Sequence, residues 1–241
     1  MIVSLFPKIR IKELMKIDLV DGYLVDGFPS VGFSSAIATE SMIQTSNFQL
    51  AGIIDSDKFP PISVVKEGKP NFPTRIFLNP ELKVGIFLSY LTLEQTFHRS
   101  VAKSMLNWAK KHGIKFVVSS VAVKSPDGNE EVLAVGSTEI AREKIKESGL
   151  KLLEHGTIPG IPGTLLNEGN ITGQNVIVVV FHTEGNSPDF KSSANLCSAI
   201  SQLIPGTSCN IPELQREAEK AEVVIKETEE ESKHLKDSMY R

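Results

Sequence analysis

The stretch that decides the fold is Val176-Ile177-Val178-Val179-Val180-Phe181, because an unbroken apolar run rich in β-branched residues predicts a strand buried on both faces. Residues 84–88 and 116–121 form two further short runs of this kind, bounded by turn-forming residues. Shorter strand candidates lie at residues 23–25, 52–54, 75–78 and 132–135. Strands buried on both faces are typical of a sheet that helices cover on both sides.

Segments with the apolar spacing of helices alternate with these strands, at residues 31–45, 93–112, 138–148, 164–170 and 189–203. The stripe of Phe97, Val101, Met105 and Trp108 predicts packing on a sheet rather than a cofactor site. We therefore predict one α/β domain over residues 1–205, with three layers: a mostly parallel or mixed sheet and helices on both faces.

Composition and charge limit the function classes. The chain has 241 residues, of which 41% are hydrophobic, as in ordinary globular proteins. Its 29 acidic and 26 basic residues give a net charge of −3, so no positive field attracts nucleic acid, and we expect no nucleic-acid partner.

The remaining composition predicts a cytoplasmic protein. Cys197 and Cys209 lack a CxxC or Cys/His pattern, so we expect two reduced apolar residues and neither a disulfide nor a zinc site. The first ten residues lack the long apolar region of a signal peptide, and no apolar run reaches the ~20 residues of a membrane span, so we expect no membrane partner.

The composition changes after Leu203. Pro205-Gly206 marks a boundary, and Pro212 suits the first turn of a highly charged helix. We predict that residues 206–241 form a projecting helix and tail that pack at most lightly, with the first turns on the body. The less polar positions follow a coiled-coil spacing that is weakest at Thr228 and Ser232: Leu214, Ala218, Ala221, Ile225, Thr228, Ser232, Leu235 and Met239.

One turn could bind a phosphate, but its residues favour a structural role. Gly27-Phe28-Pro29-Ser30-Val31-Gly32 joins a predicted strand to a predicted helix, where free backbone N–H groups can hold an anion. Pro29 removes one such donor, and no lysine is close in sequence. The turn is therefore interpreted as a tight connection in which Gly27 and Gly32 allow close approach of the backbone.

No catalytic constellation is evident in the sequence. The histidines are scattered, and His182 is the best candidate because it follows a buried strand, where α/β sheets bind ligands. The acidic loop residues are Asp55, Asp57, Glu184 and Asp189. No metal-binding spacing occurs, and we expect no cofactor, no metal and no enzymatic activity.

Three loops are unusually rich in proline and glycine: residues 27–29, 55–61 and 158–166. Because proline fixes φ, such loops bind at a low entropy cost. With Phe28, Phe59 and Ile161 expected on the surface, we predict that they form a recognition surface and make the protein a homo-oligomer even without its last helix.

The same loops carry a resemblance to the archaeal branch of the proteasome assembly chaperone family. That family shares a DGFP-x-x-G turn, an FPP loop, a Gly-rich segment before Leu-Leu, and a late Pro-Asp before a helix. The matching residues are Asp26-Gly27-Phe28-Pro29-Ser30-Val31-Gly32, Phe59-Pro60-Pro61, Gly160-Ile161-Pro162-Gly163-Thr164-Leu165-Leu166 and Glu184-Gly185-Asn186-Ser187-Pro188-Asp189. The resemblance implies a nucleoside-phosphorylase-like fold, oligomerisation and assistance to proteasome core-particle assembly.

The last three residues, Met239, Tyr240 and Arg241, look like the hydrophobic-Tyr-any tail by which proteasome activators dock between α-subunits. An apolar side chain and a ring can fill a pocket while the free carboxylate meets a cation. The predicted function is thus an assembly chaperone or activator-like factor whose partners are core-particle α-subunits. The alternative is a nucleoside-phosphorylase- or hydrolase-type enzyme acting near His182 and Glu184.

Overall fold

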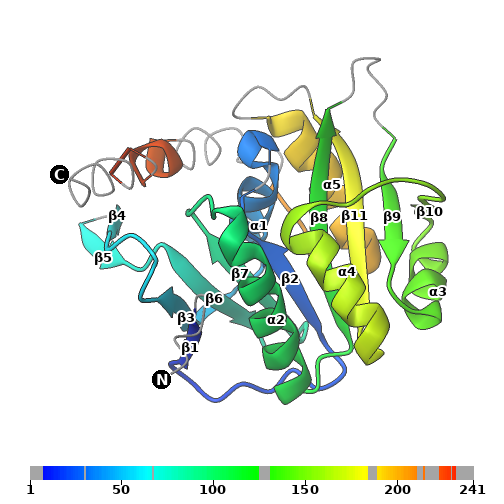
Figure 1. The fold of residues 1–241 in the computed structure, drawn as a ribbon, viewed down its shortest axis with the longest axis horizontal. Coiled ribbons are helices and arrows are strands. Elements are labelled where there is room, and N and C mark those ends of the chain that lie inside the picture. The colour runs from blue at the N-terminus through cyan, green and yellow to red at the C-terminus, as the bar shows by residue number, and fades with distance from the viewer. Residues whose placement is uncertain are drawn as a thin grey trace.

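The computed structural model describes residues 8–29, 31–66, 68–124, 131–183, 189–210, 214, 223–228 and 230–231. Within them, nine strands form one sheet (Figure 1). Across the sheet they are β1 (Ile9–Glu13), β3 (Gln49–Ser56), β6 (Thr74–Asn79), β7 (Val84–Ser89), β2 (Tyr23–Gly27), β8 (Phe116–Lys124), β11 (Asn175–Thr183), β9 (Leu133–Gly136) and β10 (Lys151–Leu152). A separate hairpin pairs β4 (Val64–Lys66) with β5 (Lys69–Asn71).

The sheet is mixed. Its centre, β7-β2-β8-β11, is parallel, whereas β1, β3, β6 and β7 pair antiparallel with one another and β9 runs antiparallel to β11. The turn between β6 and β7 is too short for a crossover connection, so these two strands are antiparallel neighbours. Of the two predicted sheet types, the mixed one is therefore confirmed.

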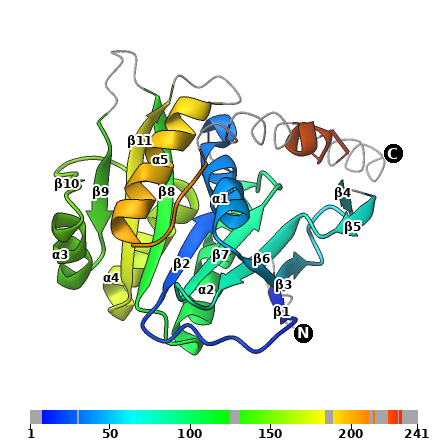
Figure 2. The same cartoon turned by 180° about the vertical axis from the view of Figure 1, so that it is seen from behind.

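Helices cover both faces of this sheet, as predicted. Helices α2 (Gln95–Lys111) and α4 (Gly160–Thr172) lie side by side on one face (Figure 1). The opposite face carries α1 (Ser34–Thr45), α3 (Glu139–Glu147) and α5 (Phe190–Leu203), with α1 beside α5 (Figure 2). The three layers of the predicted fold class are confirmed.

Strand β11 shows why the sheet needs two helical layers. Val176, Val178 and Val180 belong to the core under α2 and α4. The alternate residues, Ile177, Val179 and Phe181, belong to the core under α1, α3 and α5. A strand that is apolar at every position can be buried only when both faces are covered.

Every predicted helix and strand of the body is present, and four strands were not predicted. Strands β4, β5 and β10 have two or three residues each, which is too short for a periodic signal. Strand β1 alternates isoleucine with Arg10 and Lys12 at the edge of the sheet. Its five residues carry only a weak period-two pattern.

The expectation of two reduced cysteines is wrong, because the structure contains a disulfide between Cys197 and Cys209. After α5 the chain turns at Ile204–Thr207 with Gly206 at φ 88°, and then runs back along the helix. This reversal places the two Cα atoms 6.3 Å apart, within the range that a disulfide spans. The bond ties the C-terminal segment to α5.

The C-terminal segment packs on the body, as expected of its first turns, but more tightly and further along than predicted. Leu214 and Ile225 are 1% and 0% exposed, and they join a core cluster with Ala36, Ile37 and Tyr90. Thr228, which the sequence pattern marked as weak, is buried, and its hydroxyl oxygen lies 3.4 Å from the Tyr90 carbonyl oxygen. The helix therefore does not project freely at residues 223–228.

A polar cluster supports the surface on which this helix lies. The buried Glu40 carboxylate of α1 accepts hydrogen bonds from the Tyr90 hydroxyl and from Lys66 Nζ, both at 2.8 Å. Burial of a carboxylate is costly unless such partners satisfy it. The cluster thus joins α1, β4 and the Tyr90 loop beneath Ile225.

We predict that Ile225→Ala loosens the C-terminal helix while leaving the sheet intact. Truncating a fully buried isoleucine lowers the free energy of local opening by about 2 kcal/mol or more. Where amides exchange through local opening, this corresponds to roughly 30-fold faster hydrogen exchange. Amide exchange of residues 223–228 by mass spectrometry measures this change. The neighbouring Val223→Ala is the control, because Val223 is 55% exposed, and equal exchange in both variants would contradict the packing described above.

Candidate functional site

A cavity of about 610 Å³ lies at the carboxyl ends of β2 and β8. These strands are parallel neighbours, so their carboxyl ends reach the same edge of the sheet. In open α/β sheets this edge is the usual location of ligand sites. Three segments complete the lining: residues 28, 29 and 31 after β2, the first turns of α2, and residues 159–162 and 164 at the start of α4.

Two glycines next to the cavity allow close backbone packing. A Cβ on Gly27 would lie 2.5 Å from Thr39 Oγ1 of α1 and 2.9 Å from the Phe87 carbonyl oxygen. A Cβ on Gly163 would collide with the Ile158 carbonyl oxygen. The interpretation of Gly27 as a close-approach residue is confirmed, and Gly163 has the same role in the α4 loop.

Asp26 is the acidic residue of the cavity lining, and it is almost fully buried. Its Oδ1 accepts a hydrogen bond from the Phe28 backbone N–H at 3.1 Å, and its Oδ2 accepts one from the Ser119 hydroxyl at 2.6 Å. Burial raises the pKa of Asp26 to about 6, although both hydrogen bonds act to lower it. The carboxylate is therefore held in its charged form at a cost in stability.

The first turns of α2 place basic and polar side chains at the same cavity. Gln95 and Arg99 are exposed, and His98 is half-buried. His98 Nε2 lies 3.1 Å from the Leu93 carbonyl oxygen, so this nitrogen carries the proton and donates. Its Nδ1 then faces the α4 loop, 3.7 Å from the position of a Cβ on Gly160.

The expectation that the three Pro/Gly-rich loops expose apolar residues is wrong. Phe28, Phe59 and Ile161 are 6%, 9% and 6% exposed and belong to one core cluster. Phe59 packs on Phe97 of α2, with ring centroids 5.4 Å apart. These side chains are buried in the core, so the loops do not form the predicted apolar recognition surface. The loops at residues 27–29 and 158–166 supply walls of the cavity instead.

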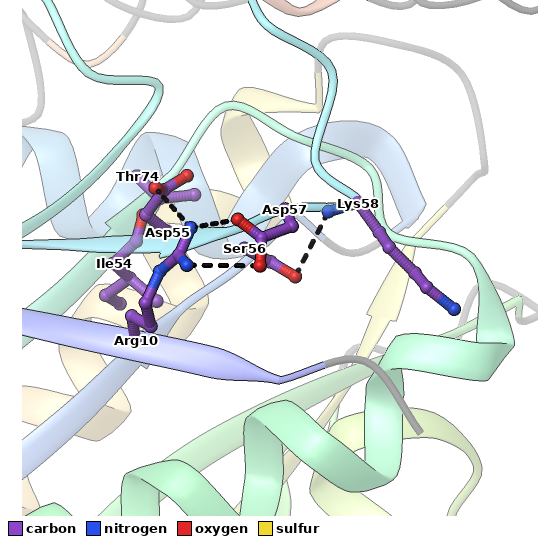
Figure 3. A network of polar contacts seen from close by, with 7 residues as sticks. All are labelled: Arg10, Ile54, Asp55, Ser56, Asp57, Lys58 and Thr74. Carbon is purple, nitrogen blue, oxygen red and sulfur yellow. Dashed lines mark hydrogen bonds and ion pairs between the residues drawn. The ribbon is translucent and has the colours of Figure 1, made fainter. Parts of the chain in front are cut away.

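The acidic residues of the 55–61 loop have a structural role. Both Asp55 and Asp57 bind the Arg10 guanidinium of β1, which raises the pKa of Arg10 mainly through the hydrogen bond with Asp57 (Figure 3). The hydroxyl of Thr74 donates to the Ile54 carbonyl, and the Lys58 N–H donates to Ser56 Oγ at 3.4 Å. The exposed ion pairs of Arg10 connect the edge strand β1 to the end of β3.

The remaining candidate residues are not brought together. His182 lies on β11 but does not line the cavity, and its buried Nδ1 has no partner among the described residues. Asp189 caps α5, where its side chain accepts from the Ser192 N–H at 2.9 Å. Glu184 and the tail residues Met239, Tyr240 and Arg241 lie outside the described residues.

Within the described part of the chain, no group of three His, Cys, Asp or Glu residues could hold a metal ion. None of its helices is long and apolar enough to cross a membrane.

Sequence reasoning did not single out Asp26, His98 or Arg99 as residues of one site. Asp26 was noticed only as part of the Asp-Gly-Phe-Pro turn, and its partner Ser119 is 93 positions away. His98 and Arg99 lie in the first turns of a helix that follows a buried strand. That position is the signal that could have identified them, because such turns face the ligand edge of an α/β sheet.

Comparison with known proteins assigns relatives over nearly the whole chain. The model of the PAC2 family matches residues 24–229. An uncharacterized protein of Methanocaldococcus jannaschii is 25% identical over 224 residues, which cover 93% of this chain and 91% of that protein.

Two solved structures from Pyrococcus furiosus are similar. PbaA, described as an archaeal homolog of proteasome-assembly chaperone, is 25% identical, with a TM-score of 0.79 over 94% of this chain and 100% of PbaA. PbaB, described as an archaeal proteasome activator, shares the fold at 20% identity, with a TM-score of 0.70 over 92% of this chain and 99% of PbaB. The likeness to nucleoside phosphorylases stays a prediction.

We predict that Asp26→Asn stabilises the protein at neutral pH. A carboxyl whose pKa rises from 3.8 to about 6 on folding makes the folded state less stable as pH increases through this interval. Above pH 6 the cost amounts to about 3 kcal/mol, which asparagine removes while it can still accept from Phe28 and pair with Ser119. Below pH 4 the advantage should vanish.

Urea unfolding of both proteins between pH 4 and pH 8 measures this difference. Asp18→Asn is the control, because Asp18 is exposed. A stability difference between Asp26→Asn and wild type that stays constant over the whole pH range would show that the Asp26 carboxyl is not perturbed by burial.

Proposed function

Because the chain belongs to the PAC2 family, we propose that it is a proteasome assembly chaperone or activator-like factor that docks C-terminal tails into the α-ring of the proteasome core particle. The observation that carries the proposal is the match to PbaA, which is 25% identical and covers 94% of this chain. PbaA is described as a homolog of a proteasome-assembly chaperone, and PbaB, of the same fold, as a proteasome activator. A role at the core particle places the protein in the cytoplasm.

The tail supplies the chemistry of docking. Met239 and Tyr240 offer an apolar side chain and an aromatic ring, and the terminal carboxylate of Arg241 offers a negative charge. A pocket between two subunits that is apolar in its depth and has a lysine or arginine at its mouth would bind all three groups. Side-chain specificity then rests on Tyr240, because the position after it accepts any residue.

The packing of the C-terminal helix supports tail presentation. The disulfide at Cys209, the buried Leu214 and the buried Ile225 fix the start of the segment on the body. The chain after residue 231 can extend by at most about 3.3 Å for each residue. A base fixed on the body limits the volume that the tail can search, which raises its effective concentration near the pocket.

Several tails on one assembly bind more strongly than one. Once the first tail docks, the second binds as an intramolecular event, so individually weak contacts sum to a stable complex. This favours a homo-oligomer, in which each subunit presents the same tail to a ring of α-subunits. The protein acts in this way as a binding partner and performs no reaction itself.

Deletion of residues 239–241, or Tyr240→Ala alone, should abolish binding to the core particle and leave the thermal transition unchanged. In this proposal the three residues contact the partner and not the body, so their loss removes binding without a loss of stability. Surface plasmon resonance with immobilised core particle measures binding, and calorimetry measures the transition.

Arg241→Ala is the matched control, because it keeps the chain length and the terminal carboxylate while it changes the position that tolerates any residue. It should bind within about threefold of the wild type, on the energy scale of a solvent-exposed side chain. Unchanged binding by Tyr240→Ala would refute the docking role of the tail.

We expect light scattering to show a homo-oligomer, with contacts at the β4–β5 hairpin. Val65 and Phe72 are 67% and 50% exposed there, whereas the proline-rich loops bury their apolar residues. Phe72→Ser should shift the mass toward the monomer, because it removes apolar contact area from the interface. Ile171→Ser, a change at an 80% exposed residue at the end of α4, should not. A monomeric wild-type protein would contradict both the oligomer and this contact.

A further inference from the structure

The proposed tail docking does not use the cavity at the ends of β2 and β8, and the lining of this cavity is chemically varied. It includes the exposed Arg99 and Gln95 and the buried Asp26. Apolar side chains also line it, among them Phe28, Val121 and Ile161. A volume of about 610 Å³ falls within the range of small-molecule sites.

Arg99 makes the cavity favourable for an anion. Arg99 forms no ion pair with any residue in the described ranges, and no other acidic side chain than Asp26 lines the cavity. A guanidinium offers a planar fork of donors that matches carboxylate and phosphate oxygens. His98, whose Nε2 is committed to the Leu93 carbonyl, adds a ring nitrogen directed toward the α4 loop.

Backbone donors add to this preference. Gln95 and Gly160, the first residues of α2 and α4, both line the cavity, and neither helix has a side-chain cap at its N-terminus. By contrast, α3 and α5 begin elsewhere and are capped by Thr138 and Asp189. In the first turn of α4 the donors are the N–H groups of Gly160 and Ile161, because Pro162 has none. Uncapped helix ends leave N–H groups that favour negative charge.

Asp26 makes the cavity favourable for a group that donates a hydrogen bond. Each carboxylate oxygen already accepts one hydrogen bond, from the Phe28 N–H or from the Ser119 hydroxyl, and each retains a second lone pair. A charge kept in a buried position at a cost in stability is a feature of functional sites. A hydroxyl or amino group is the complement of such an acceptor.

From this lining we infer that the cavity is a binding site for a small organic anion that carries a phosphate or carboxylate and also a hydroxyl or amino group. Arg99 and the N-termini of α2 and α4 bind the anionic group. Asp26 accepts the hydrogen bond from the hydroxyl or amino group, and Phe28 and Ile161 contact the carbon skeleton. The site is independent of the tail, so it can exist whether or not the protein docks to the proteasome.

Isotope-labelled full-length protein titrated with glycerol 3-phosphate tests the inference. We expect saturable chemical-shift changes at the amides of residues 95–99, 160, 161, 163 and 164. Inorganic phosphate should bind more weakly, because it lacks the hydroxyl end, and glycerol should not bind. Glycerate distinguishes the two anionic groups: tighter binding than glycerol 3-phosphate assigns a carboxylate, and weaker binding a phosphate.

Variants assign the two ends. Arg99→Ala should weaken binding of glycerol 3-phosphate at least tenfold, whereas Lys103→Ala, which removes the same charge one turn further along α2, should leave binding unchanged. Asp26→Asn should reduce the preference for glycerol 3-phosphate over phosphate, and circular dichroism verifies that each variant is folded. The inference is overturned if no anion gives saturable shifts at these residues, or if Arg99→Ala binds as the wild type does.

Discussion

The two-sided burial of the parallel strands β2, β8 and β11 is the constraint on which the rest of the structure depends. Because consecutive residues of β11 belong to opposite core clusters, both faces of the sheet need helices. A chain that connects parallel strands must return across a face each time, so the helices after β2 and β7 begin at the same edge of the sheet. The ends of these strands, the first turns of α2 and the loop before α4 therefore meet there, and the cavity is the space that they enclose.

This constraint also explains which parts of the fold were predictable. The burial of a continuous apolar run such as Val176–Phe181 can be predicted from its own residues, and the same holds for the amphipathic helices. Strand β1 depends instead on its neighbour: its second residue, Arg10, is satisfied by Asp55 and Asp57, which are distant in sequence (Figure 3). Local periodicity contains no information about such a partner.

The loops and cysteines were misjudged for a related reason. A phenylalanine next to prolines has the same sequence signal whether it faces solvent or another loop, and Phe59 is buried only because Phe97 of α2 lies opposite. In the same way, Cys209 meets Cys197 only because the chain reverses after α5. The candidate site shares this dependence, since the state of Asp26 is set by its burial and by Ser119 on another strand. Helix positions can be predicted from the sequence alone. The environment of a side chain depends on residues that are distant in sequence and meet only in the folded structure.

Helix α1 is the element that both functional regions contact. On one side, Ser35 exchanges a hydrogen bond of 2.7 Å with Ser120, which lines the cavity. On the other side, Ile37 packs in the cluster that buries Ile225, and the Ala38 carbonyl faces the Cys209 sulfur at 3.5 Å.

A ligand in the cavity could therefore influence the C-terminal helix only by preferring one of two arrangements of α1. Since Ala36, Ile37 and Ala38 are fully buried and Glu40 is held by Tyr90 and Lys66, α1 is closely packed along this length. A well-packed helix of this kind resists a second arrangement, so the physical expectation is that the cavity and the tail act as independent sites on a common scaffold.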